Sequence, residues 1–240
     1  MRKMIPILPR RSFSCQDRRM TDRRMTAPAA AKRKSKRRAR TPKAVPKPYH
    51  HGHLRETLLQ AADAVLAQRG VSGITLRDVA RVAGVSHAAP YHHFASLDDL
   101  LAAVAERAFI ALADALERTS AASGTQEKLL QISEAYVKCA RDSPEHFRLM
   151  FGPVLTRQRE FPGLQAASKH AFGLLLAAAC AHDAENGPEL ALCGWSLAHG
   201  LSNLMIDGAL DGLPIKLPDR DKLSRLLTLR ALGASLLNGA

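Results

Sequence analysis

Apolar residues recur at helical spacing from residue 54 onward, and polar residues fill the positions between them. Residues three or four apart lie on one face of a helix, so this spacing predicts an amphipathic helix. Gly70 stands where a C-cap glycine is expected and marks the end of that helix. The apolar stripe comprises Leu54, Leu58, Ala61, Ala62 and Val65.

Two short helices are predicted next. Thr75 can cap the first of them, because Asp78 follows three residues later as in a capping box, and Gly84 ends it. Ser86 can cap the second, which we expect to run to about His93.

Start and stop signals continue to the end of the chain. Ser96 precedes a long periodic segment, and Ser143 is followed by proline and glutamate, a typical cap and first turn. Further helices are expected at about 125–141, 161–183, 188–212 and 219–238. No segment has a convincing strand pattern or repeats another, so the sequence predicts an all-α protein of about nine helices.

Residues 75–94 join two of these helices into one motif, TLRDVARVAGVSHAAPYHHF. Gly84 supplies a turn conformation that a Cβ atom would disfavour. The natural interior set is Val79, Ala80, Val85 and Phe94. A helix-turn-helix of this kind can place its second helix in the major groove of DNA.

The motif resembles that of the TetR family of bacterial transcriptional regulators. A leading helix that ends at Gly70 is followed by T-x-x-x-V-A-x-x-A-G-V-S, by Y-H-H-F and by a serine-capped long helix, and the likeness covers about residues 53–115. A shorter segment, W-S-L-A-H-G at 195–200, resembles the WHG-type regulatory domain of some family members. The resemblance implies an N-terminal three-helix DNA-binding domain and a C-terminal helical domain for ligand binding and dimerisation.

The resemblance also implies roles for the matching residues. Ser86 would cap the recognition helix and present N–H groups to a phosphate, while His87 and Ala88 would face base edges. Tyr91 and His92 are expected to bind phosphate. Thr75 and Arg77 would contact phosphates or bases from the preceding helix, and His93 is open between packing and DNA contact. The predicted DNA-binding set is Thr75, Arg77, Ser86, His87, Ala88, Tyr91, His92 and His93.

Two positions depart from the family pattern. Family members commonly place a lysine where Leu97 stands, and leucine cannot make the phosphate contact of that lysine. Pro90 replaces a commoner large apolar residue, at a point where the short helix tolerates a missing N–H.

The net charge of +13 belongs to one end of the chain. Residues 1–48 hold 17 of the 35 Lys and Arg and only two acidic residues, so their formal charge is +15 and that of residues 49–240 is −2. We expect 1–48 to be a disordered basic arm, 49–98 the DNA-binding domain and 99–240 the ligand-binding and dimerisation domain. An alternative is that translation begins at Met4, Met20 or Met25.

We expect the arm to raise DNA affinity without setting sequence preference. It can reach an adjacent minor groove or act as an electrostatic tether, and each phosphate it neutralises adds roughly −0.9 to the slope of log affinity against log salt. A chain that starts at Pro48 would then have a shallower slope than the full chain.

The C-terminal half contains no nucleophile elbow, P-loop or GxGxxG, so we expect no enzyme and no cofactor. His50, His51 and His53 cluster beside the arm, where a solvated or DNA-facing segment is favoured over a metal site. The family resemblance implies a mostly apolar pocket for a small-molecule effector. Its candidate residues are Tyr136, His146, Phe147, Met150, Phe151, His170, Phe172, Trp195 and His199.

The last two predicted helices are apolar on more than one face, which favours pairing with a second copy in a four-helix interface. A twofold dimer would bind a near-palindromic, double-stranded operator. The longest apolar run, residues 171–181, is too short for a membrane span, and the four scattered cysteines suggest reduced thiols in the cytoplasm.

The sequence favours a ligand-responsive, homodimeric DNA-binding regulator, with repression expected from family habit. The alternatives are a non-specific nucleic-acid binder that uses the basic arm, and an enzyme. A similar affinity for promoter and random DNA would favour the first alternative, and turnover abolished by one polar substitution in 99–240 would favour the second.

Overall fold

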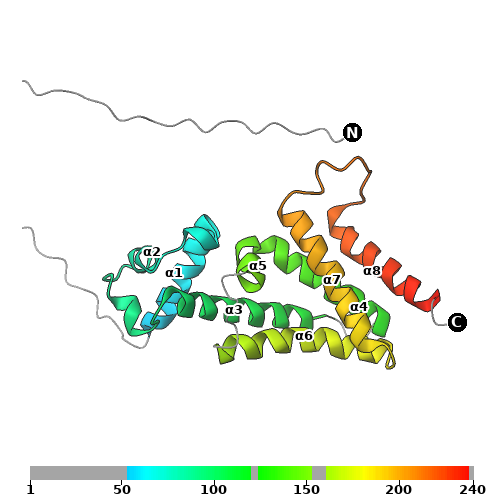
Figure 1. The fold of residues 1–240 in the computed structure, drawn as a ribbon, viewed down its shortest axis with the longest axis horizontal. Helices are drawn as coiled ribbons and strands as arrows, with labels where there is room; N and C mark the ends of the chain where they lie inside the picture. The colour runs from blue at the N-terminus through cyan, green and yellow to red at the C-terminus, as the bar shows by residue number, and fades with distance from the viewer. Residues whose placement is uncertain (1–52, 120–123, 153–160, 238–240) are drawn as a thin grey trace, which may run out of the picture. The chain divides into compact units, whose positions relative to one another are not determined.

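The computed structural model of the protein describes residues 53–119, 124–152 and 161–237, all of which belong to one compact unit, residues 48–240. The predicted arm and His50 and His51 lie outside the described residues. The described part is all-α, as predicted (Figure 1). Its α-helices are α1 (Leu54–Arg69), α2 (Leu76–Val82), α3 (Leu97–Glu117), α4 (Thr125–Asp142), α5 (Pro144–Phe151), α6 (Pro162–His182), α7 (Gly187–Ile206) and α8 (Arg220–Leu237). Two 3-10 helices, η2 (Val71–Gly73) and η3 (Ala89–His92), lie between the first three.

The predicted boundaries of α1 and α2 are confirmed. Gly70 follows α1 at φ 69°, and its N–H donates to the carbonyl of Leu66. Thr75 caps α2, because its hydroxyl oxygen accepts from the N–H of Asp78 at 3.1 Å. Gly84 follows α2 at φ 70°, as expected of the tight turn.

The predicted third α-helix, from Ser86 to about His93, is wrong. The segment is a turn followed by the four-residue η3, and no side chain caps it. Pro90 has no N–H to give the Ser86 carbonyl, which instead accepts from the N–H of Ala89 at 3.0 Å. The i, i+3 bond is that of a 3-10 turn, so the recognition element is short and tight.

The helix predicted at 188–212 is shorter than expected. α7 ends at Ile206, and Gly208 follows with φ 67°, a left-handed conformation that glycine adopts without strain. With the third helix replaced by η3, the described residues contain eight α-helices.

α3 connects the two functional parts of the chain. Its first half contacts α1, and its second half packs along α6, which lies beside it in Figure 1. α4 lies against α6, α7 and α8, and the short α5 contacts α3, α4, α1 and η2. The described residues contain no helix long and apolar enough to cross a membrane.

Candidate DNA-binding surface and internal cavity

The helix-turn-helix is held by a small apolar interior. Val79 and Ala80 of α2 are fully buried, and Phe94 is 3% exposed. The interior set predicted from the motif is therefore buried, except that Val85 is half-buried. Leu97, where the family commonly has lysine, is half-buried against the same core at the start of α3.

Every residue of the predicted DNA-binding set is exposed. His87 and Ala88 lie in the turn before η3, and Tyr91, which is 60% exposed, and His92 lie in η3 itself. His93 is also exposed, so it does not pack beneath the element. Thr75 and Arg77 are exposed at the start of α2.

The charges on this domain largely cancel one another. Residues 49–98 contain four arginines, four carboxylates and no lysine. The carboxylate of Asp78 forms ion pairs with Arg69 at 2.9 Å and with Arg81 at 3.3 Å. It also accepts a hydrogen bond from the Thr75 hydroxyl, which is the largest of the causes that lower the pKa of this carboxyl. The Arg55 guanidinium lies 5.4 Å from the centre of the Phe94 ring.

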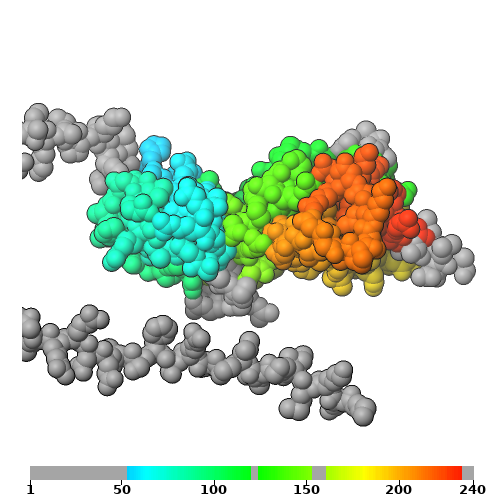
Figure 2. Space-filling view, turned by 90° about the horizontal axis from the view of Figure 1, so that it is seen from above, coloured from blue at the N-terminus to red at the C-terminus, as the bar shows by residue number. Residues whose placement is uncertain are grey.

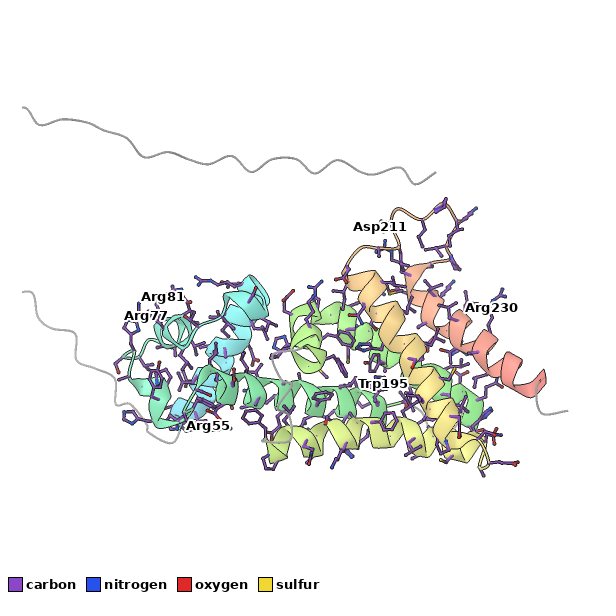
Figure 3. The ribbon with its side chains drawn as sticks, viewed as in Figure 1. Arg55, Arg77, Arg81, Trp195, Asp211 and Arg230 are labelled. Atoms are coloured by element: carbon purple, nitrogen blue, oxygen red, sulfur yellow. The ribbon has the colours of Figure 1, made fainter. Side chains whose placement is uncertain are left out.

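Arg77 differs from the other three arginines of the domain. Within the described parts of the chain its side chain has no ion pair, hydrogen bond or ring contact, and it lies exposed on α2 (Figure 3). Its guanidinium is therefore available for a phosphate or a base edge.

A cavity of about 510 Å³ lies among the helices of the C-terminal part. Its wall is mostly apolar and comes from every helix from α3 to α8. Of the nine predicted pocket residues, five line it: Tyr136, Met150, Phe151, Phe172 and Trp195. Trp195 lies on α7 (Figure 3), and its ring contacts that of Phe172 of α6 edge to face, with ring centres 5.7 Å apart.

The other four predicted pocket residues do not line this cavity. His199 and Phe147 lie behind the wall, where their rings are 5.2 Å apart and both contact Tyr136. His146 instead bonds Asp63 of α1 at 3.1 Å. His170 is exposed on α6 and bonds Glu117 of α3 at 3.1 Å.

Most residues of the cavity wall are not among those predicted from the sequence. Leu112, Leu116, Ile132 and Leu175 line the cavity, and none of them belongs to the predicted pocket set. Their spacing is the ordinary apolar spacing of a core helix, and nothing in that pattern separates a side chain that faces a cavity from one that faces another helix. The described residues also contain no cluster of three potential metal ligands.

Tyr136 is the polar centre of the wall. Its hydroxyl accepts from the Trp195 indole N–H at 3.2 Å and lies 3.0 Å from Nδ1 of His199. Burial raises the pKa of Tyr136 far above its ordinary value and lowers the pKa of His199. Both groups are therefore uncharged near neutral pH.

α5 touches both the cavity and the DNA-binding domain. Met150 and Phe151 at its end line the cavity, and His146 bonds Asp63, which also pairs with Arg107 of α3 at 3.7 Å. At the start of α5, a Cβ on Gly70 would lie 2.8 Å from a carboxylate oxygen of Glu145. The positive φ of Gly70 favours glycine, whereas the Glu145 side chain could move aside from a Cβ atom.

Comparison with known proteins places both parts of the chain in one family. The family model described as "Bacterial regulatory proteins, tetR family" matches residues 58–104, and "Tetracyclin repressor-like, C-terminal domain" matches residues 129–230. An uncharacterized HTH-type transcriptional regulator of Mycobacterium tuberculosis is 26% identical over 174 residues, which is 72% of this chain and 79% of that protein.

Solved structures agree with this placement. A protein of unknown function from Rhodococcus sp. RHA1 is 32% identical with a TM-score of 0.65, covering 78% of this chain and 98% of that one. The TetR family transcriptional regulator PfmR from Thermus thermophilus has the same fold, with a TM-score of 0.53, 21% identity and coverage of 73% of this chain and 97% of that one. The chain belongs to the TetR family, and it is a DNA-binding transcriptional regulator rather than an enzyme.

Proposed function

We propose that the protein is a homodimeric repressor that binds a near-palindromic operator and is released from it by a small-molecule effector. The DNA-contacting residues would be Arg77 and Thr75 of α2 together with the exposed turn and η3, from Ser86 to His93. The protein would act in the cytoplasm, on the chromosome, and its small-molecule partner would be the effector.

The observation that carries the effector proposal is the position of α5. This eight-residue helix supplies Met150 and Phe151 to the cavity wall and His146 to Asp63 of the DNA-binding domain. A ligand that moves the wall residues of so short a helix would also move its contact with α1. Coupling of this kind requires only that the ligand binds the two arrangements with different affinity.

The support for a dimer is the outer face of α7. Between Leu192, which is 55% exposed, and Leu204, which is 46% exposed, this face carries no charged residue. Its middle holds the small residues Cys193, Ser196 and Gly200, all exposed. In Figure 2 α7 and α8 (orange to red) lie open on the face seen from above. A long, uncharged face with small residues suits the close approach of a second copy of the same helix.

A screen and a release assay test the effector proposal. Small metabolites and hydrophobic toxicants are first ranked by their effect on the melting temperature of the protein, and those that stabilise it are then added to a protein–operator complex. We expect at least one stabilising compound to release the operator. The effector proposal fails if operator binding ignores every compound that stabilises the protein.

A further inference from the structure

The charge distribution around the cavity restricts what can bind there. Among the described residues that line it, none is acidic, and Lys169, on the exposed side of α6, is the one charged side chain. An ammonium group inside would lose its hydration without finding a carboxylate, and an anion inside would meet no buried cation. The interior is therefore suited to an uncharged molecule.

The polar groups of the wall are few and already organised. Ser133 and Thr228 are buried and bond each other, with 2.9 Å between their hydroxyl oxygens. The hydroxyl of Tyr136 accepts from Trp195 and shares a hydrogen bond with His199. The wall thus has one polar group in the middle of its aromatic part, and that group is already held in position.

The Tyr136 hydroxyl retains the capacity for one more hydrogen bond. A phenol oxygen has one proton to donate and two lone pairs, and a neutral imidazole can either donate or accept at Nδ1. If Nδ1 of His199 accepts, a lone pair of Tyr136 remains for a ligand hydroxyl. If Nδ1 donates, the Tyr136 hydroxyl can donate its own hydrogen bond to a ligand carbonyl. The pair can therefore serve either kind of ligand oxygen.

We propose that the cavity takes an uncharged lipophilic molecule with a single hydroxyl or carbonyl oxygen, which hydrogen-bonds to Tyr136. The aliphatic or aromatic body of the ligand lies against Leu112, Phe151 and Phe172. This assignment rests on the proposed function in treating the cavity as the effector site, and it adds the chemical class of the effector.

Trp195 provides a direct readout, because it is the only tryptophan of the chain and its indole contacts both the cavity and Tyr136. Quenching of its fluorescence is measured with three probes of equal chain length, 1-octanol, octanoate and octylammonium, at about pH 7.5, where the last two are charged. We expect 1-octanol to bind at least about tenfold more tightly than octylammonium, and more tightly than octanoate. Equal or tighter binding of either ion overturns the proposal.

Two variants locate the oxygen of the probe. Tyr136→Phe keeps the ring and removes the hydroxyl, so we expect affinity for 1-octanol to fall about three- to tenfold and affinity for 1-octene, which has no oxygen, to stay unchanged. Lys222→Met, at an exposed lysine of α8 that does not line the cavity, should leave 1-octanol binding unchanged. Equal losses for both probes in Tyr136→Phe, or loss of 1-octanol binding in Lys222→Met, contradict the assignment.

The same probes separate this inference from the proposed function. If 1-octanol binds as expected but neither it nor any other stabilising compound releases the operator, the ligand class stands and release by an effector fails. If octylammonium binds more tightly and releases the operator, the proposed function stands and the ligand class is wrong.

Discussion

His87 is exposed in the turn that precedes η3, two residues before the first buried residue of that element. Its imidazole can donate or accept a hydrogen bond at a base edge, whereas the Tyr91 hydroxyl is expected to meet a phosphate, which carries no sequence information. The two residues therefore make different predictions about specificity.

His87→Ala should weaken operator binding by about 1–3 kcal/mol and leave binding to random DNA nearly unchanged. Tyr91→Phe is the matched control, because it should weaken both complexes alike. Fluorescence anisotropy at one fixed salt concentration measures all four affinities. A His87→Ala variant that loses equal affinity for both DNAs would show that His87 contacts only the backbone.

His199 links the cavity to the pH dependence of stability. Burial lowers the pKa of its imidazole below the ordinary value of 6.5. As the pH falls through that value the unfolded chain takes up a proton that the folded chain does not, so the free energy of unfolding decreases toward acid. His199→Gln should therefore lose less stability than the natural chain between about pH 7.5 and pH 5.5 in urea unfolding. An unchanged pH dependence would contradict this account.

Single residues also define the limit of prediction from sequence. Candidate DNA-contacting positions could be proposed because the resemblance to the TetR family implies roles for exposed residues of the helix-turn-helix motif, and they stay a prediction. The cavity could not, since its leucines and phenylalanines have the same spacing as core residues. His146 and His170 show the same limit, because each bonds a carboxylate of another helix that is distant in sequence.

Elements were predictable where a local signal fixes their ends. Thr75 and Ser96 each accept from the N–H of an aspartate three residues later, as their sequence context indicated, and Gly70 and Gly84 have the positive φ expected of them. The third α-helix does not form, although Ser86 is a residue type that often caps a helix, because Pro90 lies in the same segment. In the fold, the missing N–H of Pro90 and the bond from Ala89 to Ser86 leave a 3-10 turn.

We expect α5 to be the element through which a ligand in the cavity influences DNA binding. His146→Ala removes its bond to Asp63 of α1 and should leave ligand binding, followed by Trp195 fluorescence, nearly unchanged. The ratio of operator affinities without and with a releasing compound should fall, by up to about 5- to 150-fold if a coupling of 1–3 kcal/mol passes entirely through this bond.

His170→Ala is the matched control for that variant. It removes a histidine–carboxylate bond of the same length, 3.1 Å, that joins α6 to α3 and does not reach the DNA-binding domain. We expect it to keep the full ratio of operator affinities. If His146→Ala keeps the ratio as well, the coupling does not pass through this bond.

At the scale of the whole molecule, the uncharged outer face of α7 predicts association. Leu204→Glu should place charge in the interface and shift the protein from dimer toward monomer in sedimentation velocity. Ile110→Glu is the control, since Ile110 is 47% exposed, close to the 46% of Leu204, but belongs to α3, which is not one of the helices packed on α7. Equal sedimentation of the two variants would contradict a dimer through α7.

The net charge of the whole chain, +13, supports a narrower conclusion about DNA binding than its magnitude suggests. The domain that carries the helix-turn-helix has equal numbers of arginines and carboxylates, and two of its arginines are paired with Asp78. We therefore expect sequence-specific binding to depend on a few exposed groups and the basic residues of 1–48 to add salt-sensitive affinity. The uneven distribution of charge between residues 1–48 and 49–240 is visible in the sequence because it depends only on composition.

Footprinting of the full-length protein on the genomic DNA of its own organism tests the central claim most directly. A dimeric TetR-family regulator should protect a small number of discrete sites, each with two inverted half-sites whose centres lie about one helical turn, roughly 10 base pairs, apart. Protection spread over DNA regardless of sequence, or confined to single half-sites, would contradict the account.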